Sequence, residues 1–382
     1  MQVLSPSWYY AATALICGAV ALSIGSSWTT AATIGVGLVG IGTMLGVSPA
    51  ITAGAVISGA YLGDKLSPLS ETTILTAQMV GVETTEHIKR QAWTSLPAFG
   101  LAFIVFLLLG FTASVSDVVD TASELAELSS LFNITPWNLL PLLLLGILCA
   151  RKVPASIALI TSALFAGVLA AFLQPGVVAV FTGESNPFMA GLKGTWTAMA
   201  TGFVKESGIE DIDRLLSRGG MDSMLLTLWL IMGAVTFGTL LEKFGLISRL
   251  ITPLLSWAKT TGKLHLAVFI SAFGLNVVAG DQYIALVLPA RLYKVEFAKR
   301  GLAPTNLSRL TADSGTVTSA LVPWNSCGAF MSATLGVSTL LYLPFALFNI
   351  FSPLLSVLYG FTGFKIEKIG PAATENKSGE EQ

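Results

Sequence analysis

The chain has 382 residues, of which 53% are hydrophobic and only 11% are charged, and its formal net charge is −1. Soluble domains usually carry about 25% charged residues, so this composition excludes a water-soluble globular enzyme. Because acidic and basic residues are nearly equal in number, the chain also has no excess of positive charge that would indicate binding to a nucleic acid. No Asp, Glu, Lys or Arg occurs before Asp64, and further long stretches are uncharged. A helix needs about 20 apolar residues to cross a bilayer, so the sequence predicts an all-α, polytopic membrane protein.

The first predicted elements are two apolar segments, residues 8–24 and 29–45, which flank the polar tip Gly25–Trp28. Charge fits a re-entrant hairpin and two full crossings equally well. A second polar interruption follows over residues 64–73. Non-helical backbone at membrane depth is tolerated only inside protein or beside water, so both interruptions indicate discontinuous helices. They contribute the candidate cation and proton ligands Ser26, Ser27, Asp64, Ser67, Ser70, Glu71, Thr72 and Thr73.

Four apolar segments in the middle of the chain are predicted to cross the membrane: 91–113, 135–150, 153–173 and 222–242. Basic residues favour the cytoplasmic side, which assigns five clusters to it: Lys89–Arg90, Arg151–Lys152, Lys259–Lys263, Arg291–Arg309 and Lys365–Lys368. The acidic segment 114–134 fits the outer side. Residues 174–220 then form an external excursion with an amphipathic piece whose apolar face carries Ile209, Ile212, Leu215 and Leu216.

The last third of the chain shows the same alternation as the first. Apolar residues 264–279 and 284–296 flank Gly280–Tyr283, and a longer polar break runs from Asp313 to Gly328. Discontinuous helices are expected here too. These breaks add the candidate ligands Asp281, Asp313, Ser314, Thr316, Asn325 and Ser326.

A gapless comparison of the chain with itself aligns residues 25–82 with 280–337, and most identities are Gly or Pro, which punctuate a backbone. The second copy is basic over 291–309, where the matching residues 36–54 carry no charge. The first copy is basic at Lys89 and Arg90, where the second is uncharged. Each copy is basic at the opposite end, which predicts two inverted-topology repeats, an arrangement of secondary transporters.

These patterns predict one transmembrane transporter domain over residues 1–370. Its repeat cores are expected at 1–113, incomplete at its N-terminal side, and at 222–361, and a polar, disordered tail is expected at 371–382. The second copy follows a long apolar helix, 223–241, whose counterpart would lie before residue 1. We therefore expect that the chain lacks one or more N-terminal helices.

Carboxylates at membrane depth are costly and indicate function. Burial raises the pKa of a carboxyl group and a nearby cation lowers it, so one site holds a proton or a metal cation but poorly both. That competition is the simplest chemistry of a cation/proton antiporter. Asp64, Asp281 and Asp313 are the expected cation and proton binders, with Na⁺ at Asp64, Asp313 and Asn325.

Structural roles remain open for the same carboxylates. The alternatives are a pair of Asp64 with Lys65, a helix-start contact of Glu71 with Ser67, and a helix-face pair of Asp313 with Arg309. His87 is expected to be solvated beside Lys89 and Arg90, and His265 to be interfacial. Because the sequence shows no nucleotide-binding loop and no Cys/His cluster, we expect no cofactor and no ATP-driven transport.

The run Ser58–Thr73 closely resembles a signature of the NhaC family of Na⁺/H⁺ antiporters. Other matching segments are Gly25–Thr30, Leu215–Met221, Asp313–Thr318 and Val322–Gly328. The resemblance covers essentially the whole chain. It implies an electrochemically driven antiporter of the bacterial inner membrane, with inverted repeats, re-entrant hairpins and broken helices. The implied partners are the lipid bilayer, Na⁺ and H⁺, and a homodimer is a further expectation.

The same family resemblance leaves alternatives to Na⁺/H⁺ exchange. Its members include a malate/lactate exchanger coupled to both ions, so a Na⁺/H⁺-coupled carboxylate exchanger is the second hypothesis. No arginine lies in the polar breaks to clamp a carboxylate, which favours cation exchange. Family members are typically longer at the N-terminus, so an inactive truncated remnant is the third hypothesis.

Overall fold

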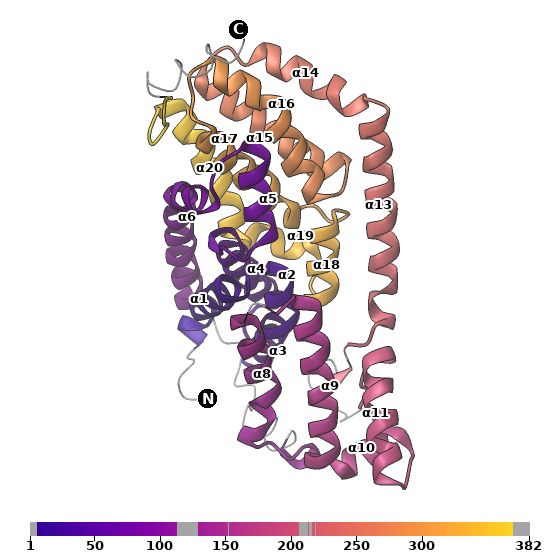
Figure 1. Cartoon of the computed structure of the whole chain (residues 1–382). Coiled ribbons are helices and arrows are strands. Elements are labelled where there is room, and N and C mark those ends of the chain that lie inside the picture. The colour runs from indigo at the N-terminus through magenta and orange to yellow at the C-terminus, as the bar shows by residue number, and fades with distance from the viewer. Residues whose placement is uncertain are drawn as a thin grey trace.

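Figure 1 shows a computed structural model of the chain, which describes residues 6–112, 129–151, 153–205, 213, 216–217 and 219–369. Its regular elements in these ranges are helices, and the paired backbone outside them is limited to isolated bridges such as Leu302 with Lys368. The all-α prediction is therefore confirmed. Most of the acidic segment 114–134, most of the amphipathic piece around 209–216 and the tail 371–382 lie outside the described residues.

The first third of the chain forms a bundle of helices interrupted at the predicted polar breaks. Its elements are α1 (Pro6–Ile24), α2 (Ser27–Thr30), the π-helix η1 (Ala31–Gly35), α3 (Val36–Met44), α4 (Pro49–Leu66), α5 (Glu71–Val80) and α6 (Thr84–Thr112). A turn at Gly25–Ser26 separates α1 from α2, and residues 67–70 separate α4 from α5.

The middle of the chain forms helices with few buried side chains. They are η2 (Pro136–Leu139), α8 (Leu140–Ala150), α9 (Ala155–Leu173), α10 (Pro175–Thr182), α11 (Pro187–Thr201), η3 (Asp222–Met224), α13 (Leu225–Lys243) and α14 (Leu246–Trp257). In Figure 1, α13 runs along the side of the body and α14 crosses one end of it.

The last third forms a second bundle that packs against the first. Its elements are α15 (Thr261–Val278), α16 (Gln282–Lys299), α17 (Pro304–Thr311), the π-helix η4 (Ala312–Thr316), η5 (Val317–Leu321), α18 (Ser326–Leu335), α19 (Thr339–Tyr342), η6 (Leu343–Phe345) and α20 (Leu347–Thr362).

The two bundles repeat each other residue for residue. Adding 255 to the bounds of α4 and α5 gives 304–321 and 326–335, which are the bounds of α17–η5 and of α18. Three glycines end helices with a positive φ in each copy: Gly25, Gly46 and Gly81 in the first, and Gly280, Gly301 and Gly336 in the second. Only glycine adopts this backbone freely, so the Gly and Pro identities mark real backbone turns. The repeat is confirmed, and the opposite orientation of its copies stays a prediction.

Corresponding elements of the two copies pack on each other crosswise. Helix α5 contacts α16, and its counterpart α18 contacts η1, which lies in the segment matching α16. In the same way α4 contacts α20, and α17 contacts α6. The cavity described below lies where these crossed contacts meet.

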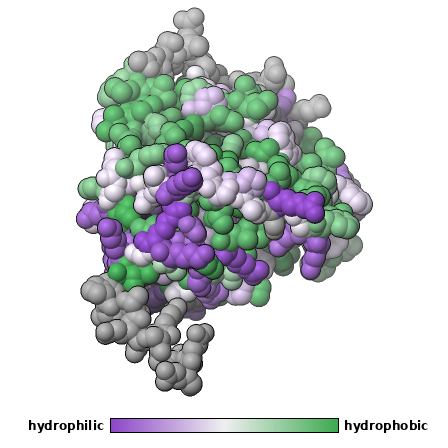
Figure 2. All heavy atoms as spheres, turned by 90° about the horizontal axis from the view of Figure 1, so that it is seen from above, coloured by the Kyte–Doolittle hydropathy of each residue, from purple (hydrophilic) through white to green (hydrophobic). Residues whose placement is uncertain are grey.

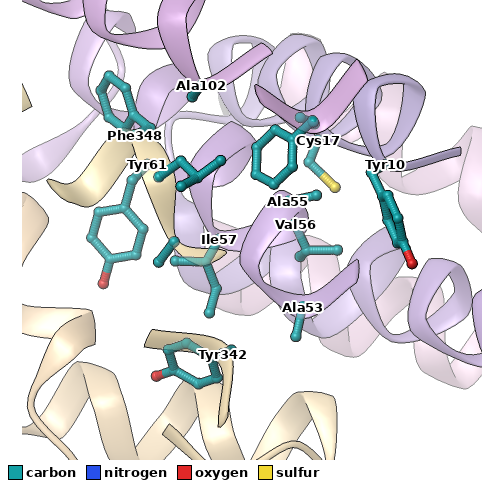
Figure 3. Packing of buried hydrophobic residues seen from close by; sticks show 14 of the residues in the cluster. Tyr10, Cys17, Ala53, Ala55, Val56, Ile57, Tyr61, Ala102, Tyr342 and Phe348 are labelled. Atoms are coloured by element: carbon teal, nitrogen blue, oxygen red, sulfur yellow. The ribbon is translucent and has the colours of Figure 1, made fainter. Parts of the chain in front are cut away.

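A core of small and aromatic side chains joins the copies. Figure 3 shows Tyr61 of α4 beside Phe348 and Ile57 of α4 near Tyr342, both partners belonging to the second copy. Helices α1 and α4 approach closely because Gly59 leaves room for the α1 backbone, where a Cβ atom would overlap the carbonyl oxygen of Ala14. Small residues serve the same purpose in membrane helix pairs generally.

Within the described part of the chain, five helices are long and apolar enough to cross a membrane: Pro6–Ile24, Thr84–Phe111, Ser156–Leu173, Asp222–Lys243 and Thr261–Val278. A sixth candidate is the bent pair Ser326–Leu335 and Thr339–Phe345, whose halves meet at 91°. The protein is therefore a multi-pass membrane protein. The first arms of both predicted hairpins, α1 and α15, meet the length criterion for a full crossing.

Most of the predicted cytoplasmic clusters meet at one end of the molecule. Arg90 binds Glu367, Arg300 binds the carbonyl oxygen of Ala258, and Leu302 bridges to Lys368. Figure 2 views the molecule from above and shows hydrophilic residues in a band between hydrophobic ones.

The turn at Arg151 lies between α8 and α9, close to the end of α1. Leu148 and Val153, on either side of it, pack with Ile24 at the end of α1. Helix α8 continues η2 without a break, and together they run from Pro136 to Ala150, which is shorter than the about 20 residues of a full crossing. The side of the membrane on which this turn lies stays a prediction.

Candidate functional site

A cavity of about 480 Å³ lies between the two copies, where four helical segments begin. Its lining comes mainly from the starts of α2, α5, α16 and α18 and from the end of α4. The lining residues are Gly25, Ser26, Ser27, Trp28, Thr29, Ala32, Asp64, Glu71, Thr72, Leu159, Ile231, Asp281, Gln282, Tyr283, Ser326 and Phe330. Asp64, Glu71 and Asp281 bring carboxylates to this surface, and no Lys or Arg is among the described lining residues.

Glycine turns place the helix starts at the cavity. Gly25 has φ +78° and lies so close to the chain after α4 that a Cβ would be 2.8 Å from the carbonyl carbon of Leu69. The next residue, Ser26, caps α2 by accepting a hydrogen bond from the Thr29 amide at 3.2 Å. In the second copy Gly280 has φ +66°, and the following Asp281 caps α16. Short polar side chains are favoured at this position because they satisfy free amide groups of the first turn.

Asp64 is the carboxylate of the cavity with the most hydrogen bonds from protein groups. Its side chain lies at the end of α4 and is 6% exposed. One carboxylate oxygen accepts hydrogen bonds from the Ser27 hydroxyl at 2.7 Å and the Ser27 amide at 3.2 Å. The other accepts one from the Ser70 hydroxyl at 2.6 Å. All of these donors are neutral, so the carboxylate is held in place without a counter-charge among its hydrogen-bond partners.

The other two carboxylates of the cavity also have neutral partners. One oxygen of Asp281 accepts hydrogen bonds from the amides of Tyr283 and Ile284, at 2.9 and 3.1 Å. Glu71, at the start of α5, accepts a hydrogen bond from the Tyr283 hydroxyl of the second copy. The contact of Glu71 with Ser67 is therefore not the one that forms. Three carboxylates in one partly buried cavity give it a negative potential that favours cations.

The hydroxyl groups of Ser67, Ser70 and Thr73 lie directly behind the cavity surface. Ser70 caps α5 and contacts the Thr72 hydroxyl at 3.0 Å. Thr73 donates to the carbonyl oxygens of Asp64 and Lys65, at 3.3 and 3.1 Å. The Ser67 hydroxyl accepts from the Leu69 amide within the turn. These contacts fix the backbone that carries Asp64.

Asn325 caps the helix that follows the corresponding break in the second copy. Its side chain caps α18 at the Cys327 amide (3.0 Å) and donates to the side chain of Asn276 at 3.0 Å. Asn276 in turn donates to the Gly315 carbonyl oxygen at 2.7 Å, inside the π-helix η4. Single π-helical turns occur often at functional sites. Ser326 follows the cap and reaches the cavity.

Asp313 lies away from the cavity in a buried ion pair. Its carboxylate contacts the Lys65 ammonium group and accepts a hydrogen bond from the Ser352 hydroxyl at 2.8 Å. Both charged side chains are 1% exposed or less. Lys65 therefore pairs with Asp313 and not with Asp64. The structure shows no hydrogen bond between the described side chains of Asp313 and Arg309, so the helix-face alternative does not form either.

The structure thus divides the predicted ligands into three groups. Those at the cavity surface are Ser26, Ser27, Asp64, Glu71, Thr72, Asp281 and Ser326; those directly behind it are Ser67, Ser70, Thr73 and Asn325; those in the separate buried region are Asp313, Ser314 and Thr316. The predicted Na⁺ set of Asp64, Asp313 and Asn325 does not meet in this cavity. Whether each residue binds the cation stays a prediction.

Several residues of the site were not selected from the sequence. Gln282 and Tyr283 line the cavity, and the Gln282 amide oxygen accepts a 3.4 Å hydrogen bond from Ser319. This pair corresponds, at the repeat spacing, to Ser27 with Asp64. Their place in the repeat alignment was the signal that could have found them.

Both histidines are buried in the protein, so the predicted solvated position of His87 is wrong, whereas the interfacial depth of His265 stays a prediction. His87 is 0% exposed and contacts the Ser308 hydroxyl at 2.9 Å through Nδ1. His265 is 0% exposed and packs against Gly360. Helix α17 covers His87. The charges of the neighbouring Lys89 and Arg90 gave no sign of this burial.

Comparison with known proteins assigns the architecture to transporters. A profile described as the Na⁺/H⁺ antiporter family matches residues 1–91 and 59–364. A Na⁺/H⁺ antiporter, NhaC, of Alkalihalophilus pseudofirmus is 38% identical over 96% of this chain and 77% of its own length. An arginine/ornithine antiporter of Halobacterium salinarum is 32% identical over 99% and 76%. A malate-2H⁺/Na⁺-lactate antiporter of Bacillus subtilis is 32% identical over 95% and 75%.

Proposed function

The chain belongs to the Na⁺/H⁺ antiporter family, and from this premise we propose that it exchanges Na⁺ for H⁺ across the cytoplasmic membrane of a bacterium. The observation that carries the proposal is the acidic cavity between the two copies, with Asp64, Glu71 and Asp281 in its lining and no described basic side chain. Alkali cations are hard ions that prefer oxygen ligands, and the cavity offers carboxylate and hydroxyl oxygens.

Asp64 is the proposed centre of the exchange. Ser27 and Ser70 orient its two oxygens, and both hydroxyl groups can turn their lone pairs toward a cation when it binds. A proton on the carboxylate removes the charge that holds the cation. Binding of one ion therefore lowers the affinity for the other, which is the condition for antiport.

The crossed packing of the copies supplies a route to alternating access. The cavity is lined from both copies, so a small rotation of one against the other opens it to one side and closes it to the other. The hydrogen bond between Tyr283 and Glu71 joins the copies across the cavity. In this proposal the chain is a transporter and not an enzyme, Na⁺ and H⁺ are its cargo, and it needs no resident cofactor. A homodimer stays a prediction.

A second candidate function is exchange of a small carboxylate coupled to Na⁺ and H⁺. The observation in its favour is that α5, α16 and α18 all begin at the cavity. Helix N-termini carry partial positive charge and attract anions. The names of two relatives, for arginine/ornithine and for malate and lactate, fit a carboxylate-bearing cargo.

One set of proteoliposomes separates the two candidates. Na⁺-driven relaxation of a pH gradient is measured first in buffer that contains no malate, lactate or ornithine, then with one of these solutes on the opposite side. We expect full exchange with Na⁺ alone. Exchange that needs the organic solute would instead establish the second candidate.

The role of Asp64 is tested in the same proteoliposomes with Asp64→Asn. We expect loss of at least about tenfold in rate, because removing a charged partner costs roughly 1.5–3 kcal/mol. Ser23→Ala is the control, since Ser23 is exposed and bonds only within α1. Wild-type exchange by Asp64→Asn would remove Asp64 from the mechanism.

A further inference from the structure

A stripe of buried polar side chains runs along the first half of α6. His87, Gln91, Thr94 and Ser95 are all 0% exposed. Their spacing of three and four residues places them on one face of the helix. The same face becomes apolar at Ala98, which belongs to the hydrophobic core. The polar part of α6 therefore lies between its start and the level of residue 98.

Two other helical segments, α17 with η4 and α20, have buried polar side chains on the faces that pack near the polar face of α6. Helix α17 with η4 contributes Ser308, Arg309 and Asp313, and α20 contributes Ser352 and Ser356, all at 1% exposure or less. Helices α6, α17 and α20 contact one another pairwise. Their polar faces therefore meet inside the protein, outside the acidic cavity.

Many polar atoms of these stripes have no hydrogen-bond partner among the described residues. They include both amide atoms of Gln91, the hydroxyls of Ser95 and Ser356, Nε and Nη2 of Arg309 and one oxygen of Asp313. Native proteins leave few buried polar groups unpaired. Ordered water is the usual partner where several such groups face one another.

The region reaches from the hydrophilic end of the molecule to the buried ion pair. At its outer end Arg90, with a side chain 33% exposed, binds Glu367. At its inner end Asp313 contacts Lys65 and Ser352. Arg309 lies between, within electrostatic reach of both Arg90 and Asp313. The other ionisable groups that face the region are His87, His265 and Tyr359.

We propose that the facing polar stripes of α6, α17 and α20 enclose a chain of water molecules, which conducts protons between the Arg90 surface and Asp313. Each proton that enters at the Arg90 surface displaces one at the inner end, where the Asp313 oxygen without a hydrogen-bond partner among the described residues takes it up, so the water is not consumed. The route is separate from the acidic cavity that receives Na⁺, so Asp313 is a second protonation site beside Asp64. Its role as a proton route rests on the proposed Na⁺/H⁺ exchange, whereas its hydration does not.

The hydration is tested by radiolytic footprinting, in which a short X-ray pulse forms hydroxyl radicals from water next to a side chain. Ser95→Cys is compared with Ala98→Cys, both in a background whose three cysteines are replaced by alanine. The two positions lie one turn apart on α6 and are equally buried, but only the first belongs to the polar stripe. We expect oxidation about tenfold faster at position 95, and equal rates would overturn the proposal.

The proton role is tested by closing the route with apolar side chains. Gln91→Leu and Ser356→Ala are expected to slow proton flux about tenfold while Na⁺ binding, measured by calorimetry, stays unchanged. Phe99→Leu on the same helix is the control, and it should leave the flux as it is. Unchanged flux in Gln91→Leu and Ser356→Ala would refute the proton role. If the wild type exchanges no Na⁺, the proposed function fails, and footprinting alone then decides on the water chain.

Discussion

Two buried aspartates of this protein have opposite surroundings. Asp64 accepts hydrogen bonds from the neutral Ser27 and Ser70 and faces the acidic cavity, whereas Asp313 contacts Lys65 and faces the protein interior. Asp64 and Lys65 are adjacent in α4, so one short stretch of helix carries a carboxylate toward the cavity and a cation away from it. A carboxylate without a counter-charge suits reversible cation binding, and one with a counter-charge is costly to leave without its partner.

The Lys65–Asp313 pair is expected to stabilise the contact between the two copies. Lys65→Met removes the cation and leaves Asp313 buried without a partner, which should cost about 3–5 kcal/mol. The double variant Lys65→Met/Asp313→Leu removes both charges and should recover most of this loss. Thermal unfolding in detergent, followed by tryptophan fluorescence, measures both. A double variant no more stable than the single one would show that the charge pair is not the cause.

Ser70 is expected to combine a cap with a ligand role. Ser70→Ala removes the cap of α5 and a donor to Asp64, so stability should fall by about 1 kcal/mol. The apparent Na⁺ affinity of exchange should fall about tenfold because a hydrogen bond to a charged group is lost.

Asn186→Ala is the matched control for Ser70→Ala. Asn186 caps α11 through the amides of Phe188 and Met189 and does not line the cavity. Its loss should lower stability by a similar amount and leave the Na⁺ affinity unchanged. If both variants show the same Na⁺ affinity, Ser70 has only a structural role.

At the scale of helices, the sequence predicted where the helices break, but not which distant side chains contact one another. Gly25 and Gly280 marked the breaks, because few residues tolerate those backbone positions. The contact of Lys65 with Asp313 joins residues 248 positions apart, and no local pattern encodes such a partner. The burial of His87 likewise depends on α17, which supplies its partner Ser308 from a distant part of the chain.

The turn between α1 and α2 depends on the absence of a side chain at residue 25. Gly25→Ala places a Cβ at positive φ and 2.8 Å from the Leu69 backbone, which should cost about 1–2 kcal/mol and displace Ser27 from Asp64. We expect a lower unfolding temperature and strongly reduced exchange.

Gly37→Ala is the control for this substitution. Gly37 lies in α3, where an added Cβ meets no atom within 4 Å, and alanine is favoured over glycine in a helix by about 0.5–1 kcal/mol. Its unfolding temperature should stay the same or rise, with exchange retained. Equal effects of the two substitutions would contradict the proposed role of the turn.

At the scale of the whole molecule, the repeat shows how the two copies are related to each other, and the charges indicate how they lie in the membrane. Matching helix ends show that the copies share one backbone plan, and crossed contacts such as α5 with α16 and α18 with η1 show an approximate two-fold relation. Only the distribution of charged residues indicates how the two-fold axis lies relative to the membrane. The clusters at Arg90, Arg300 and Lys368 gather at one end, as the charge rule predicted. The turn after α3, which matches the basic turn after α16, carries no charge.

The opposite orientation of the copies is testable at these matching turns. Ser48→Cys lies just after α3, and Lys299→Cys lies at the end of α16. Each is made in the cysteine-free background and treated with a membrane-impermeant thiol reagent in right-side-out and in everted vesicles. If the copies are inverted, position 299 is labelled from the cytoplasmic side and position 48 from the outer side, because basic turns are retained inside. Labelling of both positions from one side would mean parallel copies, and a cavity between parallel copies could not alternate its access by exchanging their conformations.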